Sequence, residues 1–209
     1  AALIEQVIGH RAVHVITLED PIEYRYETPI ALITQRQVGD HTSDFPRALR
    51  QALRQDPDVI VIGEMRDTET IAAALTAAET GHLVLATLHS RTAQGAVSRI
   101  VESFGEGSQN FVRAHLADAL VGVVSQQLVP GVAGGRVLAT EVLAASTGIS
   151  SLIREGKLHQ IGAAIDTGAA HGMQSMDRSL ATLLRRGLVS RDTAIARCVD
   201  PVGLQELIR

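Results

Sequence analysis

The fold is decided by the stretch DVIVIGEMRD, residues 58–67. Its run of aliphatic residues, 59–62, is typical of a strand that is buried on both faces, as in a parallel sheet that helices cover. Two further runs, residues 13–18 and 83–88, have the same aliphatic character. Because helical patterns alternate with these runs, the sequence predicts an α/β fold.

The helical patterns consist of apolar residues spaced three or four positions apart. Residues 68–80 show this spacing clearly, and Asp67 can cap the start of that helix while Gly81 can end it. Further helices are expected at residues 43–55, 92–104 and 108–121, and a hairpin at 123–129 and 136–144. Beyond residue 146 the pattern is helical to the end. We therefore expect an α/β domain over residues 1–145 and a small all-helical region over residues 146–209.

The composition argues against several classes of protein. The chain has 209 residues, of which 19 are basic and 23 acidic, and its formal net charge of -4 argues against a broad surface for nucleic acid. Its single cysteine, Cys198, can form neither an internal disulfide nor a zinc knuckle. No apolar run approaches the roughly 20 residues that span a bilayer. These features are compatible with the reducing cytoplasm.

Chemically active residues follow each of the three aliphatic runs. The first run leads into Glu19-Asp20-Pro21-Ile22-Glu23, the second into Gly63-Glu64-Met65-Arg66-Asp67, and the third into His89. In open α/β sheets, ligands bind beyond the carboxyl ends of the strands. If the three strands are parallel neighbours, carboxylates, Arg66 and His89 converge on one edge of the sheet.

The two glutamates Glu23 and Glu64 suit the hydrolysis of a nucleotide. An aliphatic strand that ends in a carboxylate is how P-loop NTPases present an acid to the magnesium shell, and Glu64 can serve there through water or as a base. Glu23 lies in a turn that Pro21 stiffens and can polarise a water for in-line attack on a γ-phosphate. The alternative for both residues is a solvated acid at a strand end or on a loop surface.

The histidines His82 and His89 lie seven positions apart, at the beginning and the end of the third run. On one continuous strand this odd spacing turns them to opposite faces, which argues against a shared metal ion. His89 lies at the expected functional edge and can contact a phosphate or an acidic partner. His82 is as well explained by a structural role.

A phosphate-binding loop is missing from this pattern. No G-x-x-x-x-G-K-[ST] motif occurs in the chain. Such a loop opens a helix, and residues 1–10 have the apolar spacing of the end of a helix. We therefore expect the loop upstream of Ala1, and we expect the chain as it stands to bind ATP poorly or not at all.

Three long segments resemble the secretion-ATPase superfamily of type II secretion and type IV pili. They are ITLEDPIEY at 16–24, ALRQALRQDPDVIVIGEMRD at 48–67 and TAAETGHLVLATLHS at 76–90, which are similar to its Asp box, Walker B and His box in that order. The resemblance implies an α/β, RecA-like P-loop NTPase core, partial in this chain, followed by a helical carboxyl-terminal region. It also implies a ring-shaped homohexamer that hydrolyses ATP with Mg²⁺.

The same resemblance assigns roles to individual residues. It implies that Glu23 is the catalytic glutamate of the Asp box and that Glu64 is the Walker B glutamate, which lies near Mg²⁺ through water. It implies that His82 and His89 are the two His-box histidines and contribute, with Arg66, to nucleotide binding. The Walker A motif and the amino-terminal domain of the superfamily are not in this chain.

Within the superfamily, the resemblance is best to the ATPases that retract type IV pili and drive twitching motility. It rests on SQQLV at 125–129, SLIREGKLHQIGAAIDTG at 151–168 and GMQSMD at 172–177. It implies a cytoplasmic motor, peripheral at the inner membrane, whose partner is the pilus platform protein of that membrane. One departure is GISSLIR at 148–154, where the retraction ATPases carry Ala-Ile-Arg-Asn-Leu-Ile-Arg.

Three alternatives stay open. An extension or secretion ATPase usually carries a four-cysteine zinc insert, which a chain with Cys198 alone cannot form. A similar ATPase of another pilus-assembly or type IV secretion system fits the same motifs. A non-hydrolysing interaction module on the same fold is disfavoured, because a scaffold has no need of Glu23, Glu64 and both histidines.

Overall fold

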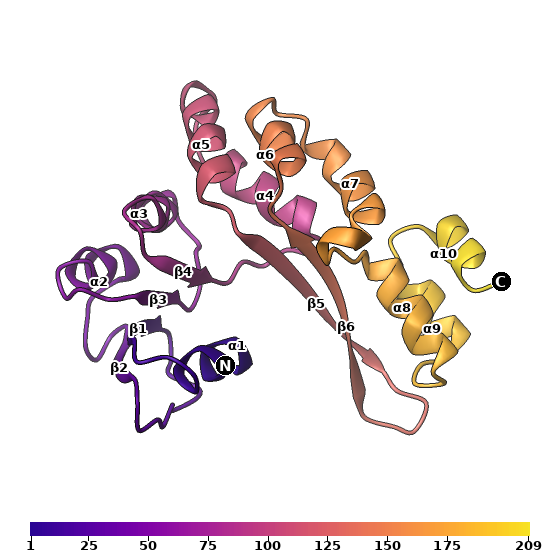
Figure 1. The fold of residues 1–209 in the computed structure, drawn as a ribbon, viewed down its shortest axis with the longest axis horizontal. Helices are drawn as coiled ribbons and strands as arrows, with labels where there is room; N and C mark the ends of the chain where they lie inside the picture. Colours follow the sequence, from indigo (N-terminus) through magenta and orange to yellow (C-terminus); the bar gives the residue numbers. More distant parts are fainter. The chain divides into compact units, whose positions relative to one another are not determined.

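The computed structural model describes residues 1–209, which form two compact units, residues 1–88 and 89–209. In each unit, helices pack against strands (Figure 1). The first unit is built on parallel strands, and the second on an antiparallel hairpin.

The first unit contains three helices and four strands. Its helices are α1 (Ala2–Ile8), α2 (Phe45–Ala52) and α3 (Thr68–Glu79), and its strands are β1 (His14–Glu19), β2 (Leu32–Gln37), β3 (Val59–Ile62) and β4 (Leu83–Ala86). The strands pair in the order β2-β1-β3-β4, and every pair is parallel. The α/β class and the parallel sheet expected from the aliphatic runs are thereby confirmed.

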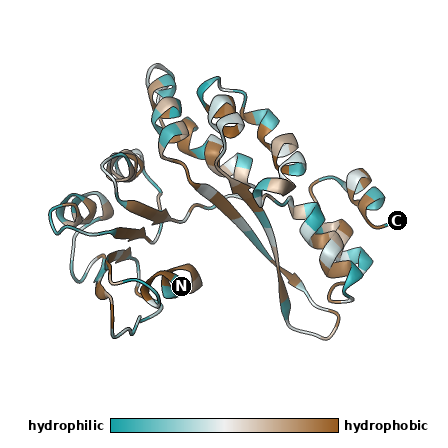
Figure 2. Cartoon of the chain, in the orientation of Figure 1, coloured by the Kyte–Doolittle hydropathy of each residue, from teal (hydrophilic) through white to brown (hydrophobic).

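Both faces of this sheet are covered, as its aliphatic strands require. On one face, Ile4 and Ile8 of α1 form a buried cluster with Val15 of β1 and Val59 of β3. On the other face, α2 packs against β1, and α3 packs against α2 and β4. The alternate residues of β1 and β3 are also fully buried, namely Ile16, Leu18, Ile60 and Ile62. Figure 2 shows these strands as a hydrophobic layer.

The helices of this unit begin and end at the residues that the sequence chemistry favours. The carboxylate of Asp67 caps α3 by accepting a hydrogen bond from the backbone N–H of Thr70 at 2.8 Å. At the start of α2, the carboxylate of Asp44 accepts from the backbone N–H of Arg47 at 2.7 Å. Gly81 follows α3 with a φ of +99°, which a Cβ would oppose. The start and end expected for the helix at 68–80 are confirmed within one residue.

Two strands differ from expectation. β2 has no counterpart among the expected strands, because Thr, Gln and Arg side chains interrupt its aliphatic run. β4 ends at Ala86, short of the expected residue 88, so His82 and His89 both lie outside it. The argument that one continuous strand turns the two histidines to opposite faces is therefore wrong.

The second unit contains a hairpin and seven α-helices. The hairpin pairs β5 (Gly122–Pro130) with β6 (Arg136–Ala144). The helices are α4 (Ala93–Glu102), α5 (Glu106–Ala119), α6 (Thr147–Arg154), α7 (Ile161–Thr167), α8 (Met176–Arg185), α9 (Arg191–Arg197) and α10 (Pro201–Leu207), with short 3₁₀ turns η1 (Leu158–Gln160) and η2 (Ala169–His171). The helices and the hairpin lie where the sequence predicts them, and the region after residue 146 contains helices joined by turns, with one isolated β-bridge between Gln174 and Val142.

Alternate residues of the hairpin are buried beneath helices. Val129 of β5 and Ala139 of β6 are fully buried in a cluster with Met176 and Leu180 of α8 and Leu204 of α10. Within the same unit, α6 packs against α5. Because of these contacts, the compact units divide after residue 88, whereas the boundary expected from sequence pattern, at 145/146, falls inside the second unit.

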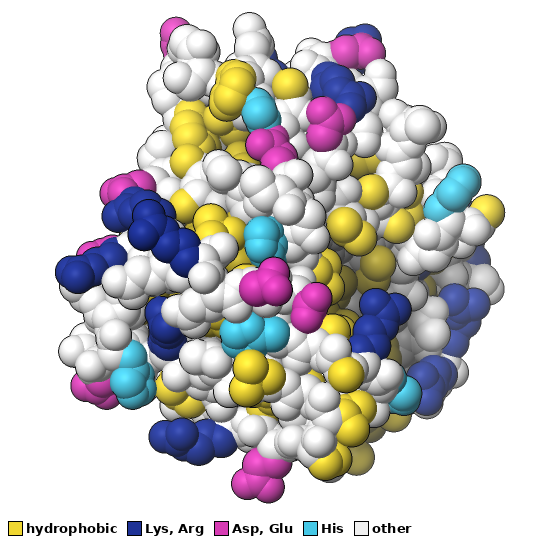
Figure 3. Space-filling view, turned by 60° about the vertical axis from the view of Figure 1, so that its left-hand side comes forward, with side chains coloured by type: hydrophobic (Ala, Val, Ile, Leu, Met, Phe, Trp, Pro, Cys, Tyr) yellow, Lys and Arg dark blue, Asp and Glu magenta, His cyan; other side chains and the backbone are white.

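None of the helices is long and apolar enough to span a bilayer. On the face shown in Figure 3, basic and acidic side chains are interspersed, as the small net charge of -4 leads one to expect.

Candidate functional site

The carboxyl ends of β1, β3 and β4 meet at one edge of the parallel sheet. The register pairs Leu18 with Ile62 and Ile62 with Ala86, so the three strands end level with one another. The chain therefore leaves this edge into residues 19–23 after β1 and into residues 63–67 after β3. The convergence of these two clusters, which the sequence predicts for parallel neighbours, is confirmed.

A glycine allows the ends of β1 and β3 to approach closely. The backbone N–H of Gly63 donates to the carbonyl oxygen of Leu18 at 2.7 Å, and a Cβ at Gly63 would lie only 3.0 Å from that oxygen. On the other side, the hydroxyl of Thr87 donates to the carbonyl of Gly63, and the N–H of Met65 donates to the carbonyl of Thr87 at 3.1 Å. Glu64 is thus held between two residues whose backbones are both hydrogen bonded.

The carboxylate of Glu64 is largely buried and pairs with Arg66. Only 15% of the Glu64 side chain is exposed, against 70% of Arg66, and the guanidinium lies 2.5 Å from Glu64 Oε2. The Nε–H of Arg66 also donates to that oxygen at 2.6 Å. This hydrogen bond, the charge of Glu64 and the more distant charge of Asp20 raise the pKa of Arg66. Arg66 is therefore an electrostatic link between the ends of β3 and β1.

The two glutamates at and after the end of β1 differ in their surroundings, because one is hydrogen bonded by other side chains and the other is exposed. Glu19 Oε1 accepts hydrogen bonds from the hydroxyl of Thr17 at 2.5 Å and from the side-chain amide of Gln35 at 3.0 Å. Glu23, by contrast, is exposed in the loop that follows β1. An exposed carboxylate can accept a proton from water, whereas one that already holds two donors is better suited to organise its surroundings.

Two residues at this site escaped the sequence analysis, Gln35 and Gln37 of β2. The register places Gln35 beside Thr17 and Gln37 beside Glu19, so both glutamines lie on the face of the sheet that carries these β1 side chains. Their side-chain amides bond to the backbone of the loop that carries Glu23. The available signal was the alternate spacing of two glutamines in TQRQ, which becomes informative only once that segment is known to be a strand.

His82 is placed apart from Glu64, and His89 belongs to the second unit. His82 precedes β4 and therefore lies at the amino edge of the sheet, opposite the edge that carries Glu64. Its Nδ1 lies 2.9 Å from the carbonyl oxygen of Ala77. The same Nδ1 also lies 3.1 Å from the hydroxyl oxygen of Thr80, so the ring of His82 is held by the end of α3. His89 is the first residue of the second unit, where its backbone carbonyl accepts from Arg99 at 3.0 Å.

The site residues suit a magnesium ion that a nucleotide brings with it, rather than a metal held by protein alone. No group of three or more His, Cys, Asp or Glu side chains is arranged to hold a metal ion. Mg²⁺ usually keeps several waters and binds through one or two carboxylates plus substrate phosphates. The carboxylate of Glu64, at a strand end and with 15% of its side chain exposed, meets that requirement.

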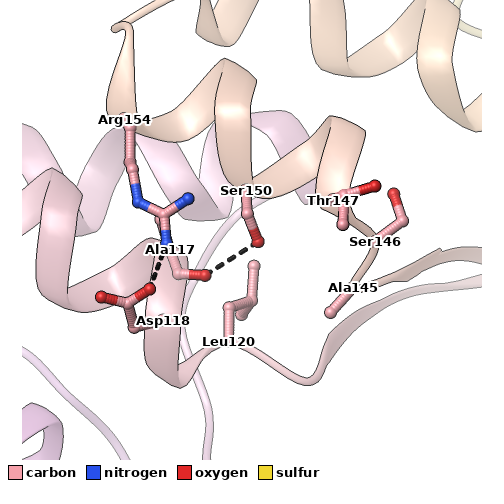
Figure 4. A pocket seen from close by; sticks show the side chains of 8 residues that line it. All are labelled: Ala117, Asp118, Leu120, Ala145, Ser146, Thr147, Ser150 and Arg154. Carbon is pink, nitrogen blue, oxygen red and sulfur yellow. Dashed lines mark hydrogen bonds and ion pairs between the residues drawn. The ribbon is translucent and has the colours of Figure 1, made fainter.

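A shallow hollow of about 410 Å³ lies in the second unit, between α5 and the start of α6 (Figure 4). Most of its polar side chains are already engaged. Arg154 pairs with Asp118, the hydroxyl of Ser150 donates to the carbonyl of Ala117 at 2.9 Å, and Ser146 caps α6. It contains neither a histidine nor a pair of carboxylates, so we assign the chemistry to the sheet edge of the first unit.

Known proteins are similar to this chain over nearly its whole length. Residues 2–136 match the family described as Type II/IV secretion system protein. The chain is 48% identical over 198 residues to the twitching motility protein of Neisseria gonorrhoeae, a match that covers 94% of this chain and 53% of that protein. It is 45% identical over 201 residues to the type IV pilus retractation ATPase PilT of Pseudomonas aeruginosa, which covers 96% of this chain and 58% of that protein.

A solved structure agrees with these matches. The crystal structure of the pilus retraction motor PilT with bound ADP superposes with a TM-score of 0.89 and 44% identity, over 98% of this chain and 58% of that one. The resemblance expected from the three motifs, and the fold that it implies, are thereby confirmed. The chain spans a little more than half the length of these relatives.

Proposed function

Because the chain belongs to the Type II/IV secretion system protein family, we propose that it is part of an ATP-hydrolysing motor that retracts type IV pili. The observation that carries the proposal is the shared edge of β1 and β3, which presents Glu64, Arg66 and the loop of Glu23 together. A second support is the 45% identity to a retraction ATPase over 96% of the chain.

Glu23 acts as the general base. Its carboxylate is exposed and lies in the loop that leaves the functional edge after β1. In this role it accepts a proton from the water that attacks the γ-phosphate, a task worth roughly 10²- to 10⁴-fold in rate.

Glu64 and Arg66 act on the metal side of the phosphates. Bound Mg²⁺ would supply charge neutralisation to the phosphate oxygens. Glu64 would hold the water shell of that ion, and its largely buried position at the end of β3 fixes where the carboxylate stands. Arg66 contributes positive charge to this edge, because it pairs with Glu64 and its exposed guanidinium can also reach an anion.

The two histidines contribute to nucleotide binding in an assembled ring. His82 lies at the opposite edge of the sheet from Glu64, so we assign it a role across a contact between subunits of a homohexamer. His89, exposed ahead of α4, serves as a contact to phosphate or to an acidic partner.

The motor works in the cytoplasm, peripheral at the inner membrane, against the pilus platform protein. It binds ATP with a phosphate loop that this chain does not contain, and it has no role with nucleic acid. These assignments follow from the family and from the two relatives, which are named for twitching motility and pilus retraction.

A second candidate is a similar motor in another pilus-assembly or secretion system. The observation that favours it is the segment GISSLIR at 148–154, the start of which departs from the signature of the retraction ATPases. A non-hydrolysing module on the same fold is the remaining candidate, and activity alone separates it from both motors.

The test is a chimera in which this chain replaces the 198 aligned residues of the Neisseria gonorrhoeae twitching motility protein. We expect the chimera to hydrolyse ATP and to restore twitching to cells that lack their own protein. Glu23→Gln and Glu64→Gln should each slow turnover by roughly 10²-fold or more, whereas the exposed Glu206→Gln should not. Hydrolysis without twitching favours the second candidate, and a well-folded chimera without hydrolysis refutes the motor.

A further inference from the structure

The loop between β1 and β2, residues 20–31, carries Glu23 but has no helix or strand of its own. Such a loop holds a side chain in place only if other groups fix its backbone. Its far part is tied to α1, because the hydroxyl of Thr28 donates to the carbonyl of Ile8 at 3.1 Å and the ring of Tyr26 packs against the cluster around Ile4. Those two contacts lie three or more residues beyond Glu23, whereas a third tie to α1, from the hydroxyl of Tyr24 to the carboxylate of Glu5, lies next to it and leaves the backbone of Ile22 and Tyr24 to be held by other groups.

The residues on either side of Glu23 are bonded by two glutamine side chains of β2. The N–H of Ile22 donates to Gln37 Oε1 at 3.0 Å. The carbonyl oxygen of Tyr24 accepts from Gln35 Nε2 at 2.8 Å. Glu23 stands between these two anchored residues, so its Cα has little freedom to move while both bonds hold.

Gln35 has every polar group of its side chain in use. Its Nε2 donates one hydrogen to Tyr24 and the other to Glu19 Oε1 at 3.0 Å, while its Oε1 accepts from the N–H of Tyr26 at 3.3 Å. A primary amide offers two donors and an acceptor, so this arrangement satisfies it and defines which end is oxygen. Glu19 is held in turn by the hydroxyl of Thr17 at 2.5 Å. A network from β1 and β2 thus reaches the loop on both sides of Glu23.

Gln37 anchors the loop through one bond and is itself fixed by another. Its Nε2 donates to Asp40 Oδ2 at 2.6 Å, which orients Oε1 toward Ile22. Gln35 and Gln37 are two positions apart on β2 and therefore project from the same face. Their amides approach the loop side by side from one rigid strand.

We propose that Gln35 and Gln37 are positioning residues for Glu23, an inference that rests on the proposed catalytic role of Glu23. They act by holding the backbone of Ile22 and Tyr24, and they touch neither the nucleotide nor the attacking water. Displacing a general base by about 1 Å can slow the reaction by up to 10²-fold. The hydrogen bonds from Gln35 and Gln37 to the loop therefore affect turnover more than they affect the affinity for ATP.

The experiment measures steady-state ATP hydrolysis by the chimera with the Neisseria protein. Gln35→Ala should lower kcat roughly ten- to a hundredfold and leave KM for ATP nearly unchanged, because the lost bonds act on the base and not on ATP. The matched control is Gln55→Ala, which removes an exposed glutamine of the same unit whose side chain carries no hydrogen bond and should leave kcat unchanged.

A double variant separates positioning from a general structural effect. If Gln35 acts through Glu23, then adding Gln35→Ala to Glu23→Gln should lower kcat by no more than about twofold further. Gln37→Ala, which removes one anchoring bond and leaves Gln35 intact, should show a smaller loss of kcat with the same non-additivity. The Gln37→Ala variant keeps the inference testable if Gln35→Ala weakens the fold.

The outcomes distinguish this inference from the proposed function. Wild-type turnover in Glu23→Gln refutes the catalytic role of Glu23 and with it the positioning role of Gln35 and Gln37, whereas only a folded chimera without hydrolysis refutes the motor. Slow turnover in Glu23→Gln together with normal turnover in both glutamine variants overturns the positioning role alone. Full additivity of Gln35→Ala and Glu23→Gln, or a rise in KM that matches the fall in kcat, also overturns it.

Discussion

Glu141 of β6 is a buried carboxylate that ties two helices to the hairpin. The side chain is 6% exposed, and it accepts hydrogen bonds from the N–H of Ala93 at 2.6 Å and from the N–H of Met176. These are the first residues of α4 and α8. Ser175, the residue before α8, makes no capping hydrogen bond with its side chain, so Glu141 supplies an acceptor at that helix start.

Removing this carboxylate should destabilise the second unit measurably. Glu141→Ala leaves two buried N–H groups without an acceptor, at about 1–3 kcal/mol each. Burial already penalises the charge of Glu141, so its loss offsets part of that cost, and we expect a net loss of about 2–4 kcal/mol. Glu141→Gln keeps one acceptor oxygen and should lose about half as much.

The same burial makes the contribution of Glu141 depend on pH. Desolvation, with smaller effects from Asp177 and Asp166, raises the pKa of Glu141 above its ordinary value of 4.5. The folded protein therefore binds this proton more tightly than the unfolded chain does. The stabilisation is complete below pH 4.5 and is lost as the pH rises through the raised pKa, so the gap in stability between the wild type and Glu141→Gln should narrow over that window.

The assay is urea unfolding followed by circular dichroism, together with hydrogen exchange at individual amides. Exchange at Ala93 and Met176 should be faster in Glu141→Ala, because both amides lose their acceptor. Glu206→Ala, at an exposed position of α10, is the control and should shift stability by less than about 0.5 kcal/mol. The reasoning fails if Glu141→Ala behaves like this control, or if the two amides exchange at the wild-type rate.

Three further predictions concern local structure. Asp67→Ala should cost about 1 kcal/mol in urea unfolding, because α3 loses its capping carboxylate; an unchanged unfolding midpoint would contradict the cap. Gly81→Ala should destabilise the protein by about 1 kcal/mol, because Gly81 has a φ of +99°. Gly107→Ala should stabilise it by about 0.5–1 kcal/mol, because Gly107 lies inside α5 with open space around it. Equal melting temperatures for these two variants would refute the conformational argument. Leu204→Ala, fully buried, should cost about 2–5 kcal/mol in the same assay, while Val202→Ala, 70% exposed on the same helix, should cost under about 0.5 kcal/mol.

Much of the fold follows from local patterns in the sequence. The aliphatic run of β3 and the regular spacing of apolar residues in α3 each reflect the geometry of one strand or one helix. Both elements lie where the pattern predicts them. The start of α3 was predictable for the same reason, because the capping bond of Asp67 joins residues only three apart. The edge strand β2 was not predictable from its own sequence. Its polar side chains make hydrogen bonds to residues far away in the chain instead of packing in a core.

The residues of the site also fall into those that local sequence predicts and those that only the folded chain identifies. The sequence by itself determined that Glu64 and Arg66 follow a buried strand and that Glu23 follows another, because strand ends are local features. Only the tertiary structure decided that Gln35 bonds to both sides of the site, to Glu19 and to Tyr24, and that Glu141 lies buried at two helix starts. Such roles depend on which distant backbone groups need a partner, and pairing between remote segments is a property of the packed chain rather than of any single pattern within it.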